Sequence, residues 1–210
     1  MSRCSVEAMV LGLVGTNVYI VSNTQTKQAL LVDPADRAEA ILDKCKKDGL
    51  TIEAILLTHG HFDHILAAKE ISSAVGAPIY VHEAELRLLG DARLNSSAKW
   101  MSPFTLTVDK PVKEGDVLSL AGFALTVLHT PGHTAGSCCY YLEEEGILIS
   151  GDTLFRGSYG RTDLPTGNEA EIFASVRRLL SELPDKVQVF PGHMGATTIG
   201  FEKKHNLLVR

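Results

Sequence analysis

The 210-residue sequence lacks several features that would assign it to a particular class of protein. No apolar run reaches the roughly 18 residues that a membrane-spanning helix needs, so we expect no membrane partner. There is no basic block and the formal net charge is -5 at pH 7, so we expect no nucleic acid partner. The N-terminus reaches Glu7 before any apolar segment of the signal-peptide kind, which predicts a cytoplasmic location.

The cysteines form neither a CxxC pair nor a spacing typical of a disulfide framework. We therefore expect reduced structural thiols at all four positions: Cys4, Cys45, Cys138 and Cys139. Cys138 and Cys139 are adjacent within an apolar strand pattern, so one should face each side of that strand. No linker, repeat or low-complexity segment interrupts residues 1–210, and 45% hydrophobic residues suffice for a core, which predicts a single domain.

Strands with short turns and amphipathic helices occur in both halves of the chain. The expected strands cover residues 6–13, 17–22, 29–33, 52–57, 79–81, 117–120, 123–129, 137–142, 147–150 and 187–190. The expected helices cover residues 38–47, 65–75, 83–90, 168–183 and 199–208, and residues 91–103 are expected to form a loop. This mixture predicts a layered α/β or α+β domain.

The most distinctive stretch is the heptapeptide THGHFDH. The apolar segment before it reads as a buried strand, and side chains on extended backbone repeat every second residue, so His59 and His61 can face the same side. Asp63 and His64 follow where the next helix is expected to begin. A helix N-cap role for Asp63 and loop positions for the histidines are the ordinary alternative. Three imidazoles and a carboxylate within six residues favour a site for zinc, iron or manganese.

Three further ligand-type side chains each follow an expected apolar strand and stand close to a glycine: His133, Asp152 and His193. Glycine permits tight turns and close backbone approach, and sheet proteins gather sites at strand ends. Alone, each could be an ordinary loop or turn residue. Together with the heptapeptide they favour two adjacent metal ions. The remaining histidines are expected to have packing or surface roles: His82, His129 and His205.

The motifs THGHFDH, PGHT, GDT and PGHM, in this order, resemble those of the metallo-β-lactamase superfamily. The resemblance covers nearly the whole chain and includes Asp33, which matches the family's first motif. It implies an α+β fold, a four-layer αββα sandwich in which two mixed sheets are flanked by helices. It also implies a metal site at the rim between the two sheets.

The same resemblance implies two divalent ions, with zinc as the first choice and iron or manganese as alternatives. The first ion would be held by three histidines: His59, His61 and His133. The second would be held by a carboxylate and two histidines: Asp63, His64 and His193. Asp152 would bridge the two ions, so that Asp63 and Asp152 are the expected catalytic carboxylates. Asp33 would orient the ligands from behind.

The segment GDTLFRGSYGRTD resembles the glyoxalase II branch of the superfamily, the hydroxyacylglutathione hydrolases and their small bacterial relatives. Arg161 occupies the place of a basic residue that contacts the thiol carrier in that branch. Tyr159 and Arg156 are further candidates for substrate binding. A salt bridge from Arg161 to Asp163 or Asp152 is the structural alternative.

The segment that closes the sequence, residues 198–206, also resembles the glyoxalase II branch. Full-length enzymes of that branch add a helical C-terminal domain that supplies further glutathione contacts. That domain is not expected here, since only residues 194–210 follow His193. Weaker binding of glutathione is therefore expected.

The branch implies a small-molecule thioester substrate, with S-lactoylglutathione or a related hydroxyacyl thioester as the first choice. Two divalent ions about 3.5–4 Å apart can share a hydroxide that attacks the carbonyl carbon, and their charge stabilises the oxyanion. A thiol leaving group of pKa about 8.5 needs little help from protonation. The oligomeric state is not predicted.

Other activities on the same fold remain compatible with these motifs. Mononuclear iron persulfide dioxygenases carry a similar GRTD loop and do not use the histidines of the second site. Hydrolysis of lactones or other esters would need no change in the metal centre. A nucleic acid hydrolase would normally add a basic surface or an extra domain. A metal-binding scaffold without turnover would give no reason for all seven ligand positions to be filled.

Overall fold

The computed structural model describes residues 3–209 and contains two six-stranded mixed sheets, with a further two-stranded sheet beside them. The first large sheet, sheet A, has the strand order β1-β2-β3-β4-β5-β6. Its strands are β1 (Cys4–Leu11), β2 (Thr16–Asn23), β3 (Gln28–Val32), β4 (Thr51–Leu56), β5 (Ile79–His82) and β6 (Lys110–Val112). The pairs from β1 to β3 are antiparallel, and those from β3 to β6 are parallel.

The second large sheet, sheet B, has the strand order β14-β13-β10-β9-β8-β7. Its strands are β7 (Val117–Leu120), β8 (Phe123–His129), β9 (Cys138–Leu142), β10 (Ile147–Gly151), β13 (Gln188–Pro191) and β14 (Thr197–Thr198). Only β10 and β13 pair in parallel. The small third sheet is a hairpin of β11 (Leu154–Phe155) and β12 (Ser158–Tyr159).

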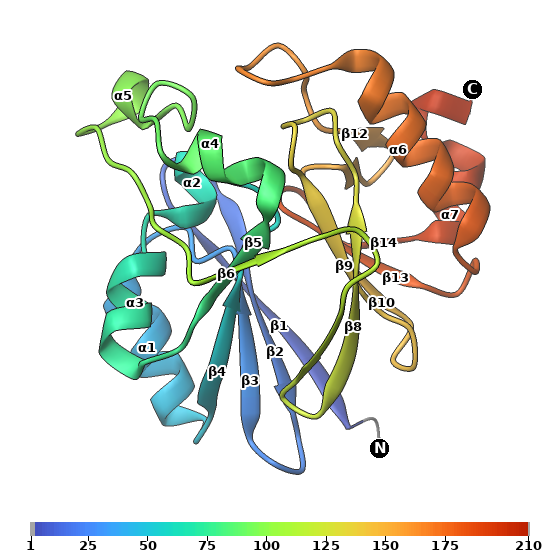
Figure 1. Cartoon of the computed structure of the whole chain (residues 1–210). Coiled ribbons are helices and arrows are strands. Elements are labelled where there is room, and N and C mark those ends of the chain that lie inside the picture. Colours follow the sequence, from blue (N-terminus) through green and yellow to red (C-terminus); the bar gives the residue numbers. More distant parts are fainter. Residues whose placement is uncertain (1–2, 210) are drawn as a thin grey trace.

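Helices cover the outer face of each large sheet (Figure 1). On sheet A these are α1 (Ala38–Lys47) and α3 (Ala68–Val75), and on sheet B they are α6 (Glu169–Glu182) and α7 (Ile199–His205). Shorter helices surround one end of the sheets: α2 (Phe62–Ile65), η1 (Glu83–Glu85), α4 (Leu86–Leu89), α5 (Ser97–Trp100) and η2 (Leu207–Val209). The predicted four-layer αββα sandwich is confirmed.

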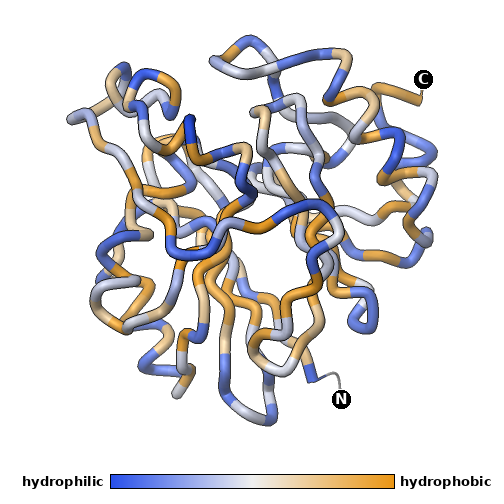
Figure 2. Tube along the Cα trace, viewed as in Figure 1, coloured by the Kyte–Doolittle hydropathy of each residue, from blue (hydrophilic) through white to orange (hydrophobic). Residues whose placement is uncertain are grey.

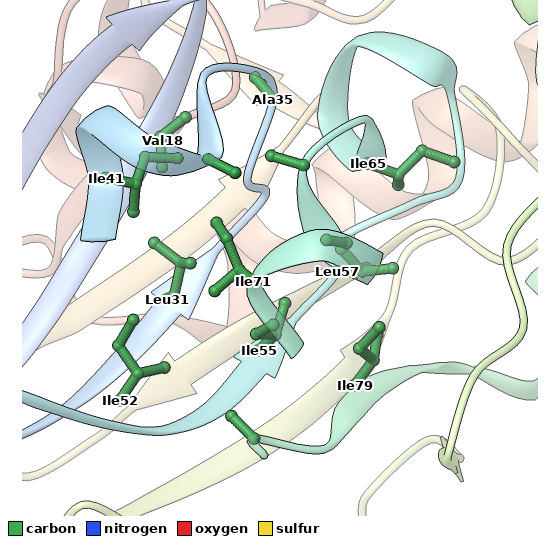
Figure 3. Packing of buried hydrophobic residues seen from close by; sticks show 14 of the residues in the cluster. Val18, Leu31, Ala35, Ile41, Ile52, Ile55, Leu57, Ile65, Ile71 and Ile79 are labelled. Atoms are coloured by element: carbon green, nitrogen blue, oxygen red, sulfur yellow. The ribbon is translucent and has the colours of Figure 1, made fainter. Parts of the chain in front are cut away.

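Three apolar layers hold the four structural layers together, and the two-residue repeat of the strands explains them. In β3, Ala29 and Leu31 pack under α1 and α3, whereas Leu30 and Val32 pack between the sheets. Figure 3 shows the first layer, where Ile41 of α1 lies near Leu31. Hydrophobic segments concentrate in these strands, while the peripheral turns are mostly hydrophilic (Figure 2).

The adjacent cysteines of β9 follow the same alternation, as predicted. Cys138 belongs to the layer between the sheets, and Cys139 belongs to the layer under α6. No disulfide joins any of the four cysteines within residues 3–209. Within residues 3–209, no helix combines the length and the apolar character that crossing a membrane requires.

Several predicted boundaries were wrong. The single helix expected over residues 65–75 is two helices, α2 and α3, because the backbone N–H of Ala67 donates to the carbonyl of Pro34 (3.0 Å). The loop expected over residues 91–103 contains α5, and the last helix ends at His205. The sequence analysis missed β6, β11, β12 and β14, which are only two or three residues long.

Candidate metal centre

The seven ligand-type residues named from the sequence meet at one edge of the sandwich. Two follow β4, two lie on α2, and one each follows β8, β10 and β13: His59, His61, Asp63, His64, His133, Asp152 and His193. The loops approach so closely that glycine is required between them. A Cβ on Gly192 would collide with the Oδ1 atom of Asp152, and one on Gly160 would collide with its carbonyl oxygen.

The first group consists of His59, His61 and His133, which are all buried. Each offers one ring nitrogen within 4.8 Å of the others. The Nδ1 atom of His61 lies 2.9 Å from the Nε2 atom of His133. The expectation that His59 and His61 face the same side is met, since their ring centroids are 4.9 Å apart.

The second group consists of Asp63, His64 and His193. The Oδ2 atom of Asp63 lies 3.6 Å from His64 Nε2 and 3.4 Å from His193 Nε2. Asp63 lies inside α2, whose N-cap is His61, so its carboxylate does not cap the helix. Instead it faces the two imidazoles and accepts a hydrogen bond from Thr16 Oγ1 (3.1 Å).

The carboxylate of Asp152 lies between the two groups. Its Oδ2 atom is 3.5 Å from His133 Nε2 and 3.5 Å from His193 Nε2. Its Oδ1 atom is 3.5 Å from His64 Nε2. One side chain therefore reaches both groups, which is the position that a bridging ligand needs.

The polar atoms at the centre fit metal ions because they have no other partner in the described part of the chain. Four buried atoms here accept or donate no hydrogen bond: the Nε2 atoms of His59, His61 and His64 and the Oδ1 atom of Asp152. An unsatisfied buried polar atom typically costs about 1–3 kcal/mol. Imidazole nitrogens and carboxylate oxygens suit zinc, iron and manganese. The cluster could therefore hold divalent metal ions.

Hydrogen bonds behind the rings determine which nitrogen is free. Asp33 accepts from the backbone N–H of Thr58 (2.8 Å), from Thr58 Oγ1 (2.6 Å) and from His64 Nδ1 (2.9 Å). Because the Thr58 hydroxyl donates to Asp33, its oxygen accepts from His59 Nδ1 (3.2 Å). In the neutral form of each ring, Nε2 is therefore the nitrogen that carries the lone pair, so in both His59 and His64 it is the atom that a metal ion would bind in exchange for any proton there.

A third group of ligand-type atoms, formed by Asp33, His59 and His64, is also compact. Its carboxylate is already occupied by the three hydrogen bonds described above. Asp33 therefore orients its neighbours rather than facing the cavity. On the other side of the centre, the backbone carbonyl of Arg161 performs the same task, since it accepts from His133 Nδ1 (2.7 Å).

The charges of the centre favour a bound cation. Burial lowers the pKa of His59 and of His61 well below its ordinary value, so both rings are neutral at pH 7. Burial acts in the same direction on His64, but the carboxylates of Asp63, Asp152 and Asp33 outweigh it and raise the pKa of His64 to about 10. Burial would raise the pKa of Asp63, and the neighbouring His64 and His193 lower it instead. The carboxylates thus create a negative field at the position of the second group.

A cavity of about 550 Å³ opens above these residues. Arg161 and Tyr159 line it, as the sequence analysis expected of substrate-binding residues. The guanidinium of Arg161 also forms two hydrogen bonds with Asp163, both 2.6 Å. Arg156 does not line this cavity, and its contact with a substrate stays a prediction. Arg156 lies in the turn between β11 and β12, and its guanidinium is 5.4 Å from the ring centroid of Phe201 on α7.

Two buried carboxylates support the centre and were missed from the sequence. Glu85 accepts from the backbone N–H groups of Gly60 (3.2 Å) and Gly136 (2.8 Å), and so joins the loops that carry the first group. Glu202 on α7 accepts from the backbone N–H of Gly157 (2.9 Å) and so holds the β11–β12 hairpin. Neither residue had a recognisable signal, because only tertiary contacts explain why these charges are buried.

The histidines outside the cluster lie where the sequence analysis expected them to. His82 and His129 stack on each other, with ring centroids 4.0 Å apart and an interplanar angle of 5°. His205 lies on the exposed side of α7, next to the ring of Phe201. None of the three belongs to a group of ligand-type atoms within residues 3–209.

Comparison with known proteins identifies relatives over nearly the whole chain. The probable metallo-hydrolase YqgX of Bacillus subtilis is 36% identical over 200 residues, which are 94% of each chain. Hydroxyacylglutathione hydrolase GloC of Haemophilus influenzae is 33% identical over 184 residues, which are 86% of each chain.

Solved structures show the same fold. The BLEG-1 B3 metallo-β-lactamase superposes with a TM-score of 0.92 at 38% identity, over 98% of this chain and 99% of that one. The di-iron-bound form of TTHA1623 gives 0.85 at 38% identity, over 96% and 98%. ETHE1 from Myxococcus xanthus gives 0.81 at 28% identity, over 97% and 83%. The family model of the metallo-β-lactamase superfamily matches residues 11–193. With its cluster of histidines and aspartates at the sheet edge, this chain belongs to the metallo-β-lactamase superfamily of metal-dependent hydrolases.

Proposed function

We propose that the protein is a dinuclear metal-dependent thioester hydrolase that acts on S-lactoylglutathione or a related hydroxyacyl thioester. The observation that carries this proposal is Asp152, whose two oxygens face the two ligand groups and connect them into one centre. The likeness to hydroxyacylglutathione hydrolase GloC supports a thioester as the substrate, and the likeness to a di-iron-bound structure supports two ions.

In this proposal the two ions are zinc, or a mixture that includes iron or manganese. His59, His61 and His133 hold the first ion, and Asp63, His64 and His193 hold the second, with Asp152 shared. Two bound divalent ions supply Lewis acidity, which activates water near neutral pH and stabilises negative charge on a carbonyl oxygen.

The chain's own residues supply orientation and binding. Asp33, through its hydrogen bonds to Thr58 and His64, keeps two imidazoles in the tautomer that binds a cation. Arg161 lies at the cavity mouth with its side chain 62% exposed, where it can contact an anionic group of the thiol carrier. No serine or cysteine nucleophile is required, and the buried cysteine thiols have raised pKa values because of burial.

The test compares metal-loaded protein with the same protein stripped by a chelator. We expect hydrolysis of S-lactoylglutathione by the loaded protein, its loss on stripping, and its return when zinc is added back. A lactone and glutathione persulfide with oxygen-uptake detection complete the panel. Oxygen consumption with the persulfide, without thioester hydrolysis, would overturn the proposal in favour of a mononuclear iron dioxygenase.

A further inference from the structure

The mouth of the metal cavity carries a group of exposed large apolar side chains, which we call the apolar rim: Leu13, Val14, Trp100 and Met194. They are four of the eleven large apolar side chains that are exposed within residues 3–209. Leu13 is 74% exposed and Met194 is 62% exposed. Large apolar side chains scattered singly over a surface are ordinary, whereas a cluster beside a cavity marks a binding surface.

Part of the apolar rim is anchored to the metal centre itself. Leu13 and Val14 lie in the turn between β1 and β2, and the residues that follow this turn contact the ligand loops. The hydroxyl of Thr16 donates to Asp63 Oδ2 (3.1 Å). The backbone N–H of Asn17 donates to the carbonyl of Gly192 (2.8 Å), one residue before a ligand histidine.

Met194 is held in a backbone conformation that a methionine rarely adopts. Its φ angle is 67°, in the left-handed region, and it directly follows His193. The side-chain amide of Asn17 donates to the carbonyl of Met194 (2.8 Å) and keeps this conformation in place. A strained backbone conformation persists only where surrounding contacts hold it in place, and such conformations are frequent at ligand-binding sites. Here the conformation fixes a flexible apolar side chain at the edge of the cavity.

Positive charge lies at a different part of the mouth. Arg161 lines the cavity, and its backbone carbonyl accepts from His133, which belongs to the first ligand group. Lys99 also lines the cavity, with its Nζ atom 5.1 Å from the ring centroid of Trp100. Leu13, Val14 and Met194 are instead tied to the second ligand group. Three residues of the apolar rim are therefore tied to the second group, whereas Trp100 lies beside Lys99.

We propose that the preferred substrates are thioesters with an extended apolar acyl chain and an anionic thiol carrier. The acyl chain packs against Leu13, Val14 and Met194, and the carrier's anionic end lies beside Arg161 and Lys99. This inference rests on the proposed thioester hydrolysis and names its substrate class. A lactoyl group is too small and too polar to cover the apolar rim.

The reaction is the hydrolysis already proposed. The oxygen of a water molecule forms a bond to the acyl carbon, and the bond between that carbon and sulfur breaks. The products are a carboxylate and a thiol, and one proton is released to solvent. No oxidant or reductant is involved.

The test measures binding separately from turnover. Trp100 is the only tryptophan of the chain and lies in the apolar rim, so its fluorescence reports occupancy of the cavity. The probes are S-methyl-, S-butyl- and S-octylglutathione, thioethers that cannot be hydrolysed. We expect the dissociation constant to fall about two- to fourfold for each added methylene that is buried. We also expect kcat/KM to rise from lactoyl- to octanoylglutathione.

The double substitution Leu13→Ser with Val14→Ser should flatten the dependence on chain length and leave the binding of S-methylglutathione unchanged. Val117→Ser is the matched control, because Val117 is 62% exposed on β7 and does not line the cavity. Equal dissociation constants across the thioethers, or a chain-length dependence that survives the double substitution, would overturn the inference. Chain-length-dependent binding without hydrolysis of any thioester would support the apolar rim and overturn the proposed reaction instead.

Discussion

At the scale of single residues, metal binding at the centre depends on which ring nitrogen of each histidine carries a proton. Asp33 accepts three hydrogen bonds, two from Thr58 and one from His64. Through them it leaves a free Nε2 atom on both His59 and His64. The family resemblance predicted a supporting role for Asp33, but only the structure shows that it acts on two histidines at once.

Asp33→Asn tests this role. The amide has one acceptor oxygen instead of two, so it cannot satisfy Thr58 and His64 in the same geometry. We expect metal affinity to fall about 10- to 100-fold, as is usual for residues that orient metal ligands, while the fold is retained. Competition with a chelator of known affinity measures the change, and the exposed Glu39→Gln is the control. An unchanged affinity would mean that Asp33 is only a packing residue.

Arg161 can act in an ion pair and in substrate binding, since its guanidinium is hydrogen-bonded to Asp163 and the residue also lines the cavity. Arg161→Ala should raise KM for an anionic thioester more than it lowers kcat, if the contact is equally strong in the ground and transition states. Asp163→Asn removes the same exposed ion pair but leaves the cation, so its KM should stay the same or fall. Equal KM values for wild type and Arg161→Ala, with lower thermal stability, would support the salt-bridge reading.

The metal-ligand residues could be predicted from the sequence because each combines a suitable side chain with a suitable position. The direction in which a side chain points, as for Arg156, could not be predicted. Five of the seven ligand-type residues follow strands beside a glycine and the other two lie on α2, and the structure brings all seven together. Arg156 was grouped with Tyr159 and Arg161 by nearness in sequence, although it points toward Phe201. A sequence motif does not state the direction of each side chain in a tight turn such as the one that contains Arg156.

At the scale of elements, the strands were predictable because both faces of most of them are buried. β3 and β9 each pack into an apolar layer on both sides, so in the sequence they are short, nearly continuous apolar runs between turn residues, which is typical of buried strands. The break between α2 and α3 was not predictable, because its cause is the hydrogen bond from Ala67 to Pro34, 33 positions earlier in the chain. Tertiary contacts of this kind override local helix propensity.

The short helix η1 contributes the buried carboxylate of Glu85, which joins two ligand loops. In Glu85→Gln, the side-chain NH₂ group would face the backbone N–H of Gly60 or of Gly136, which is itself a hydrogen-bond donor. We expect the free energy of unfolding to fall by about 1–3 kcal/mol, since a buried donor loses its partner. We also expect weaker metal binding, because Gly60 separates His59 from His61.

Urea unfolding of the metal-free and metal-loaded protein measures both effects. Glu83→Gln, an exposed change two residues earlier in the same helix, is the control. If the two variants have equal stability and equal metal affinity, Glu85 does not join the loops in the way proposed.

At the scale of the whole molecule, the two sheets meet through polar as well as apolar contacts. The stacked rings of His82 on β5 and His129 on β8 connect sheet A to sheet B. Burial and the neighbouring His129 lower the pKa of His82 to about 4. The folded protein therefore binds a proton at His82 less readily than the unfolded chain, whose histidines titrate near pH 6.5.

This difference predicts a loss of stability in acid. The contribution of His82 is complete above pH 6.5 and declines as the pH falls toward 4, because only the unfolded chain takes up the proton. Between pH 7 and 5, wild type should lose about 1–2 kcal/mol more than His82→Asn, measured by urea unfolding in the presence of a chelator. Asparagine keeps an acceptor for the backbone N–H of Ala84. His205→Asn, on the exposed side of α7, should keep the wild-type slope, and parallel curves for all three proteins would contradict the prediction.

The central claim is that Asp152 connects two metal sites in one catalytic centre. Elemental analysis of protein purified without chelator tests it directly, with Asp152→Ala and His129→Asn measured alongside. We expect close to two divalent ions per wild-type chain, a similar content for His129→Asn, and a large loss for Asp152→Ala, since a bridging carboxylate serves both ions. One iron per chain with an empty second group, or equal metal content in wild type and Asp152→Ala, would contradict it.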